Sequence, residues 1–143
     1  MKLTQETKQK ITDEYNEWFE DQYGDKSLEE RKELGAFFTP PDLTIQMIEK
    51  FDCDSLENKT ILDPTLGAGG LIVGCIIAGA DPKKCYGNEI DADILDIARR
   101  RLKKFNVPFN NLHQGDATET RCIEKSSFTS NYIWERYEVE DLW

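Results

Sequence analysis

The sequence predicts an α/β fold in which helices wrap a parallel sheet of about three strands, preceded by an N-terminal helical extension. Three short apolar runs indicate the strands, at residues 60–63, 84–89 and 111–115. Helical patterns at residues 71–80 and 92–105 separate these runs. Strands that alternate with helices are typical of βαβ units, whose strands are parallel. With 143 residues, one domain with a buried core is expected.

Residues 1–34 are expected to form the helical extension. In residues 4–23, apolar and aromatic side chains recur at three- and four-residue steps, which predicts an amphipathic helix that begins near Thr4. A second short helix is expected at residues 28–34, because Ser27 precedes it with a glutamate at capping-box spacing. The aromatic residues here are interpreted as a packing face, and nothing in this stretch suggests chemistry.

A segment with two aromatic residues and two prolines follows, Gly-Ala-Phe-Phe-Thr-Pro-Pro at residues 35–41. It is interpreted as a turn that starts a helix, with Thr39 as the N-cap and a proline in the first helical position. The helix is expected to run to about residue 51, and a linker at residues 53–58 leads to the first strand.

The first strand leads into a glycine-rich turn, Asp-Pro-Thr-Leu-Gly-Ala-Gly-Gly at residues 63–70. Glycine has no Cβ atom, so backbone N–H groups at the start of the next helix can face a ligand there. A lone glycine cluster fits an ordinary βα turn equally well. The residue that favours a ligand site is Glu89, which ends the second strand 22 residues after Gly67. In nucleotide-binding βαβ units, an acid at about this distance accepts hydrogen bonds from ribose hydroxyls.

Each predicted strand ends on an acid, at Asp63, Glu89 or Asp116. The carboxyl ends of parallel strands lie on one edge of a sheet, where the ligands of such folds bind. The sequence therefore predicts a ligand site at which these three acids come together.

The formal net charge of −10 is spread along the chain, so no segment forms a basic arm. Strong affinity for a nucleic-acid backbone is therefore not expected from this chain alone. One basic cluster, at residues 99–104, lies at the end of a predicted helix. These cations are interpreted as facing the negative end of the helix dipole, with a nucleic-acid contact as the alternative.

Four cysteines and one histidine limit the metal and redox chemistry. The cysteines form no Cys-x-x-Cys pair, so no metal site is expected. Cys75 and Cys85 lie in apolar runs and are interpreted as buried thiols in a reducing compartment. The N-terminus has no apolar signal core and no run is long enough to span a membrane, so a cytoplasmic protein without membrane association is expected.

Four motifs within residues 35–118 together resemble the S-adenosylmethionine-binding half of adenine-N6 DNA methyltransferases, a class that includes the modification subunits of type I restriction systems. They are Gly-Ala-Phe-Phe-Thr-Pro-Pro at 35–41, Ile-Leu-Asp-Pro-Thr-Leu-Gly-Ala-Gly-Gly at 61–70, Asn-Glu-Ile-Asp at 88–91 and Gln-Gly-Asp-Ala at 114–117. The aromatic-Thr-Pro segment narrows the match to this class, because the glycine motif alone is shared by many methyltransferases. The resemblance implies a partial Rossmann-like methyltransferase fold, with residues 35–118 as the S-adenosylmethionine-binding domain.

The resemblance also implies a set of cofactor contacts at positions that match the motifs. The methionine end of the cofactor would lie against Phe38, Thr39 and Pro40. Its amino and carboxylate groups would be held by Asp63 and by the turn through Pro64, Gly67 and Gly69. The ribose hydroxyls would be bound by Glu89, a face of the adenine would lie against Ile90, and the adenine amino group would donate to Asp116 beside Ala117.

Methyl transfer to an exocyclic amine needs a further segment in this family, Asn/Asp-Pro-Pro-Tyr/Phe, which accepts the amine hydrogens and stacks on the flipped-out base. The last proline of the sequence is Pro108, so no such segment follows Asp116 and no catalytic residue is assigned. The chain is therefore expected to be inactive in isolation, as a truncated enzyme or one part of a split enzyme. DNA would be its substrate only together with a partner chain.

Without a fourth strand, the first strand at residues 60–63 would be an unpaired edge. Residues 119–143 are the candidate cover, because this aromatic tail is too apolar for a disordered end. The tail is expected to pack on the same chain, and a contact with a second copy or a partner subunit is the alternative.

Other functions compatible with these residues stay open at this point. The chain could be a non-catalytic protein that binds or sequesters S-adenosylmethionine, or that occupies a subunit's place in a restriction-modification complex. It could also imitate DNA through its acidity, although the cofactor-site residues would then have no purpose. Among enzymes, a protein or RNA amino-methyltransferase would share the Asp-Pro and glycine features.

Overall fold

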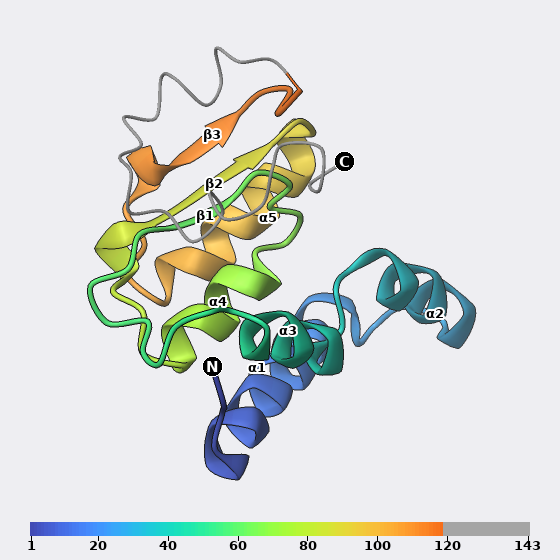
Figure 1. Cartoon of the computed structure of the whole chain (residues 1–143). Helices are drawn as coiled ribbons and strands as arrows, with labels where there is room; N and C mark the ends of the chain where they lie inside the picture. The colour runs from blue at the N-terminus through green and yellow to red at the C-terminus, as the bar shows by residue number, and fades with distance from the viewer. Residues whose placement is uncertain (119–143) are drawn as a thin grey trace.

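The computed structural model describes residues 1–118, and Figure 1 shows how their helices and strands are arranged. The helices are α1 (Gln5–Tyr23), α2 (Leu28–Phe37), α3 (Pro41–Glu49), α4 (Gly70–Ile77) and α5 (Ala92–Lys103). The strands are β1 (Ile61–Asp63), β2 (Cys85–Glu89) and β3 (Leu112–Gln114). Two short 3-10 helices, η1 (Pro82–Lys84) and η2 (Phe109–Asn111), lead into β2 and β3.

The three strands form one sheet in the order β1-β2-β3, and both pairs are parallel. Ile61 lies opposite Cys85 in the first pair, and Gly87 lies opposite Leu112 in the second. Each strand begins one residue after its expected start, so the predicted α/β fold with a three-stranded parallel sheet is confirmed. Within residues 1–118, β1 is an edge strand of this sheet, as predicted.

Helices α4 and α5 cover one face of the sheet (Figure 1), because α4 packs on β1 and α5 packs on β2 and β3. Helices α1 and α3 pack on α4 and on each other, which makes a further layer away from the sheet. One apolar core runs through these layers and includes Ile11 of α1, Ile48 of α3 and Ile72 of α4. The N-terminal helix is therefore packed into the same core as the sheet.

Helices α1 and α2 begin at the capping residues that the sequence predicted. The Thr4 hydroxyl accepts a hydrogen bond from the Thr7 N–H at 3.1 Å, and the Ser27 hydroxyl accepts one from the Glu30 N–H at 3.2 Å. Each bond satisfies one of the N–H groups that a helix start leaves without an intrahelical acceptor.

The boundary between α2 and α3 differs from the prediction in two respects. Helix α2 continues to Phe37, beyond its expected end at residue 34. Thr39 is not the N-cap of α3, because Pro40 takes that position without a side-chain cap and Pro41 begins the helix. The second difference has a physical cause: a residue that precedes proline is driven into extended backbone, as Pro40 is with φ −72° and ψ 157°.

The remaining helices agree with the prediction in place and end slightly earlier. Helix α3 ends at Glu49, α4 at Ile77 and α5 at Lys103. Cys75 and Cys85 are fully buried, as predicted, and their burial raises the pKa of both thiols.

In the described part of the chain, no helix combines the length and the apolar character that a membrane crossing requires. The aromatic tail at residues 119–143 lies outside the described residues, and so does its predicted role as the cover of β1.

Candidate functional site

The three strands all end on the same edge of the sheet, which we call the carboxyl edge, and backbone hydrogen bonds continue beyond the strand ends. The Leu66 N–H, in the turn after β1, donates to the Asn88 carbonyl at 2.8 Å. The Gly115 N–H, just after β3, donates to the Glu89 carbonyl at 3.1 Å. The turns that follow β1 and β3 are thus both tied to the end of β2.

Glu89, the last residue of β2, connects two loops through its carboxylate. One oxygen accepts a hydrogen bond from the Gly67 N–H and the other accepts one from the Asp91 N–H, each at 2.9 Å. An ionised carboxylate offers about four lone-pair sites, so these two bonds leave acceptor capacity for a ligand. Ile90 follows Glu89 and is 63% exposed, which places an apolar residue at the surface beside the carboxylate.

Asp63, the last residue of β1, is a buried carboxyl group with 8% of the residue exposed. The Thr65 N–H donates to it at 3.0 Å. Burial raises its pKa to about 6, and the negative charge of Glu89 adds to the rise, while the bond from Thr65 opposes it. A cationic group close to Asp63 would favour the ionised form of this carboxyl group.

The glycine turn has two residues in the left-handed backbone region, Gly67 with φ 57° and Gly69 with φ 84°. At Gly69, an added Cβ would lie 3.0 Å from a methyl carbon of Leu102, so helix α5 closes off that side. At Gly67, an added Cβ would meet nothing within 4 Å. The turn is therefore packed on one side and open at Gly67, whose N–H already points to Glu89.

Asp116 lies just after β3 and has a local hydrogen-bond network. One of its oxygens accepts from the Thr118 hydroxyl at 2.6 Å and from the Thr118 N–H at 2.9 Å. The bond from the hydroxyl, followed by the bond from the N–H, lowers the pKa of Asp116 below its usual value. This carboxylate stays ionised, and its other oxygen can accept a further hydrogen bond.

The aromatic-Thr-Pro segment lies beside the start of α4. A Cβ added to Gly70, the first residue of α4, would be 3.7 Å from the Thr39 carbonyl oxygen. Phe38 itself is 6% exposed and packs edge-on against Trp18, with 5.3 Å between the ring centroids. The segment is therefore anchored by Phe38 in an aromatic cluster, while Thr39 and Pro40 are exposed next to the glycine turn.

The structure thus brings the predicted site residues from four parts of the chain close to the carboxyl edge.

A comparison with known protein families identifies the family to which the chain belongs. The family described as N-6 DNA methylase matches residues 6–131, which is most of the chain. The chain belongs to the N-6 DNA methylase family.

This membership confirms the resemblance to adenine-N6 methyltransferases, whose members generally take their methyl group from S-adenosylmethionine. The Type II methyltransferase M.VspI of Vibrio sp. (strain 343) is 29% identical over 109 residues, which cover 74% of this chain and 24% of that protein. The rRNA N(6)-adenosine-methyltransferase METTL5 of Danio rerio is 32% identical over 79 residues, which cover 55% of this chain and 35% of that protein. The chain therefore spans about a quarter of one relative and a third of the other.

Among solved structures, a type I restriction-modification system methyltransferase subunit from Streptococcus thermophilus matches with a TM-score of 0.47 and 24% sequence identity. The match covers 58% of this chain and 19% of that subunit.

Asn88 lies at the candidate site, within the Asn-Glu-Ile-Asp motif, and no role was predicted for it. Its amide nitrogen donates to the Gly115 carbonyl at 2.9 Å and to the Pro64 carbonyl at 3.4 Å. A single side chain thus ties the loops after β1 and β3 to β2. The position of Asn88 near the end of the second predicted strand was the only sequence signal for this role. Its hydrogen bonds to backbone carbonyls could not be predicted, because such bonds leave no pattern in a sequence.

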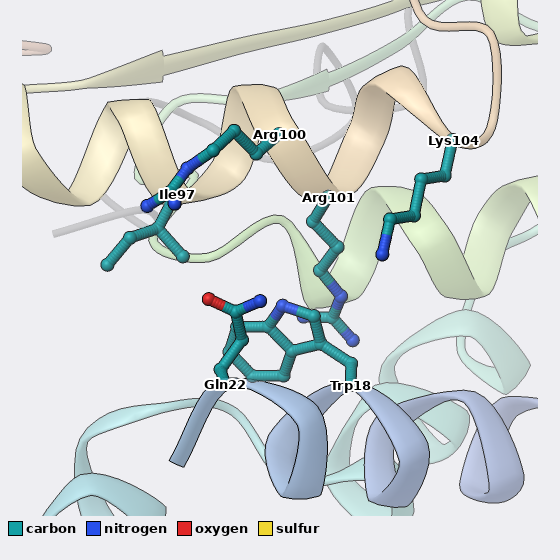
Figure 2. Close-up of a pocket in the computed structure, with 6 residues that line it drawn as sticks. All are labelled: Trp18, Gln22, Ile97, Arg100, Arg101 and Lys104. Atoms are coloured by element: carbon teal, nitrogen blue, oxygen red, sulfur yellow. The ribbon is translucent and has the colours of Figure 1, made fainter.

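Arg101 is the second residue without an assigned individual role. Arg100, Arg101 and Lys103 lie in the last turn of α5, as predicted for the basic cluster, and Arg101 is buried there. Figure 2 shows its side chain directed from α5 towards Trp18 of α1. Its acidic partner, Glu14, is 87 positions away, so no local pattern could have indicated the pair.

Proposed function

We propose that this chain binds S-adenosylmethionine at the carboxyl edge, as the cofactor-binding part of an N6-adenine methyltransferase. The observation that carries the proposal is the hydrogen bond from the Gly67 N–H to Glu89, because it joins the open point of the glycine turn to the acid at the end of β2. Family membership supports the choice of cofactor.

The residues at this edge suit the chemical groups of S-adenosylmethionine. The buried Asp63 would pair with the methionine ammonium group, which would keep the carboxyl ionised at neutral pH. Glu89 has free lone pairs for two ribose hydroxyls. Ile90 would cover a face of the adenine, and Asp116 would accept from the adenine amino group.

The other expected contacts belong to the two backbone segments around this centre. Thr39 and Pro40 would lie at the methionine end, with Phe38 as their buried anchor. Pro64, Gly69 and Ala117 would contribute through the backbone shape of their turns.

Bound S-adenosylmethionine supplies an electrophilic methyl group, and transfer also requires a site that orients the accepting amine. No Asn/Asp-Pro-Pro-Tyr/Phe segment occurs at residues 117–143, because the last proline of the sequence is Pro108. We therefore propose that this chain binds the cofactor without transferring the methyl group, and that DNA becomes a substrate only when a partner supplies that segment. The β1 edge is where a strand from such a partner, for example a restriction-modification subunit, could pair.

Calorimetric titration of S-adenosylmethionine tests the cofactor site. Glu89→Gln should weaken binding by about tenfold or more, because an amide cannot accept at both atoms as the carboxylate does. Glu57→Gln is the matched control, since it removes the same charge from an exposed side chain and should leave the affinity unchanged. Equal affinities for the wild type and Glu89→Gln, or no binding by the wild type, would contradict the proposal.

A second assay addresses methyl transfer separately. Labelled S-adenosylmethionine is incubated with unmodified DNA and this chain alone, and incorporation of the label into DNA is measured. No incorporation is expected, and label in the DNA would overturn the proposal that a partner is required.

A further inference from the structure

The buried arginine of α5 has contacts to two other parts of the molecule. Arg101, which is 4% exposed, donates from Nε and Nη2 to the two carboxylate oxygens of Glu14 in α1, at 2.9 and 2.6 Å. Its guanidinium carbon lies 4.1 Å from the ring centroid of Trp18, also in α1. Its Nη1 donates to the Ala68 carbonyl in the glycine turn at 3.3 Å. One planar group therefore connects α1 to the glycine turn.

Such an arrangement is suited to arginine. A guanidinium buried away from water is costly unless its charge is paired and its N–H groups are bonded. The bidentate bond to Glu14 pairs the charge, and the Trp18 ring covers the face of the guanidinium. The remaining nitrogen is then directed at Ala68 by the rigid geometry of the fork, which the flexible single ammonium group of lysine cannot reproduce.

Ala68 lies between the two glycines that shape the turn. The Gly67 N–H is bonded to Glu89 on the sheet side, and the Gly69 N–H is bonded to the Leu66 carbonyl at 3.0 Å. Leu102, next to Arg101 in α5, limits the space at Gly69. The turn is thus held by the sheet at Gly67 and by two adjacent residues of α5 at positions 68 and 69.

The aromatic cluster around Trp18 also anchors the aromatic-Thr-Pro segment, through Phe38. Trp18 packs edge-on against Phe38, and Tyr23 of α1 stacks on Phe38 with 5.8 Å between the ring centroids. Figure 2 shows Trp18 beneath the guanidinium of Arg101, with α5 above and α1 below. Helix α1 therefore supports both the glycine turn, through Arg101, and the Thr39–Pro40 backbone, through Phe38.

We propose that Arg101 is a positioning residue for the cofactor site, fixed by Glu14 and Trp18, and that it holds the glycine turn in its binding shape through the Ala68 carbonyl. Helix α1 then contributes to cofactor binding indirectly, because it supplies Glu14 and Trp18. The inference rests on the proposed function for its effect on S-adenosylmethionine, while its effect on the turn is independent of any ligand.

The first test uses Arg101→Lys, with Val107→Ala as a control that disturbs the core just beyond the C-terminal end of α5. Two quantities are measured: the affinity for S-adenosylmethionine and the hydrogen-exchange rates of the Leu66, Gly67 and Gly69 amides. Arg101→Lys should weaken binding and accelerate these three amides by about tenfold each. Val107→Ala should lower the melting temperature and leave both quantities near the wild-type values.

A paired replacement separates folding from positioning. Exchanging both members of a buried ion pair for apolar residues of similar size can restore stability. In Glu14→Leu/Arg101→Met, the melting temperature should recover towards that of the wild type, whereas the fast exchange at residues 66–69 and the weak binding should persist. Glu14→Gln, which keeps a hydrogen-bond acceptor, should have a smaller effect than Glu14→Ala.

The outcomes distinguish this inference from the proposed function. If the wild type binds S-adenosylmethionine and Arg101→Lys behaves like Val107→Ala in both measurements, the positioning role of Arg101 is wrong and the cofactor site stands. Recovery of affinity together with stability in the double variant would equally overturn it. If the wild type binds no S-adenosylmethionine, the proposed function fails, and the exchange rates alone decide the role of Arg101 in the turn.

Discussion

Asp63 is an acid whose burial costs stability. Its carboxyl group keeps a proton up to a pH of about 6 in the native state, because burial raises the pKa from its usual 3.8. In the unfolded chain the proton leaves at the usual value. Between these two pH values the native state binds more protons than the unfolded state, so the free energy of unfolding falls as the pH rises through this window. Above about pH 6 the full cost is present.

Asp63→Asn should therefore stabilise the protein at neutral pH, by up to about 3 kcal/mol from the size of the pKa shift. The asparagine oxygen can still accept from the Thr65 N–H, and no charge is buried. The melting-temperature difference between variant and wild type should grow from pH 4.5 to pH 7. Binding of S-adenosylmethionine should weaken in the same variant. A difference that does not change with pH would mean that Asp63 is not the titrating group.

Gly67 and Gly69 make a matched pair in which stability and binding should separate. Gly69→Ala combines left-handed strain of about 1–2 kcal/mol with crowding against Leu102, so it should clearly lower the melting temperature. Gly67→Ala carries the strain alone, because its Cβ meets open space. That space is the proposed cofactor position, so Gly67→Ala should lose more affinity than its small loss of stability explains. If both variants lost stability and affinity in proportion, the open side of the turn would not be the binding side.

At the scale of elements, the contact between α3 and α4 depends on a glycine inside a helix. A Cβ at Gly74 of α4 would lie 2.5 Å from the Thr44 methyl carbon and 3.0 Å from the Ile48 Cδ1 of α3. The close approach of these two helices explains why a residue with poor helix propensity occurs at a buried helical position.

Gly74→Ala should destabilise the protein by about 1–3 kcal/mol, because the overpacking at α3 exceeds the gain of about 1 kcal/mol in helix propensity. Gly35→Ala in α2 is the control, since the same change there meets nothing within 4 Å and should be neutral or stabilising. Chemical denaturation of the two variants provides the comparison, and a stabilising Gly74→Ala would show that α3 can move away at little cost.

Local chemistry determined how well each element could be predicted. Strands and long helices were found near their predicted positions, because apolar runs and helical periodicity depend on neighbouring residues. The prediction of Thr39 as an N-cap was wrong because it weighed the capping preference of threonine without the effect of two successive prolines on the preceding residues. The buried Arg101 could not be predicted at all, since Glu14 and Trp18 reach it only through tertiary packing.

For the whole molecule, the sheet topology could be predicted from the sequence, whereas the hydrogen bonds between site residues could not. Alternating strands and helices predicted a parallel sheet, and the sheet places Asp63, Glu89 and the residues before Asp116 at one edge. The bond between Gly67 and Glu89 required the register and the turn geometry, neither of which is visible in residue types. The cofactor roles of these residues stay predictions that the titrations can test.

The net charge of the chain and the contacts of its basic cluster bear on nucleic-acid binding. The chain has a formal charge of −10, which disfavours binding to a nucleic-acid backbone. Three members of the basic cluster have partners within the fold: Arg99 donates to the Leu112 carbonyl, Arg100 pairs with Asp96, and Arg101 pairs with Glu14. The interpretation of this cluster as part of the helix end is therefore favoured over a nucleic-acid contact.

The Asn88 amide has a consequence for how this edge can change over evolutionary time. Because one side chain bonds the backbones of the loops after β1 and β3, an insertion or deletion in either loop is expected to move that loop's carbonyl away from the Asn88 amide. Changes of loop length at this edge are therefore expected to cost a hydrogen bond, whereas replacement of an exposed side chain such as Ile90 costs none of these bonds. New ligand preferences at this edge would thus arise by replacement of side chains, while the loop backbones keep their conformation.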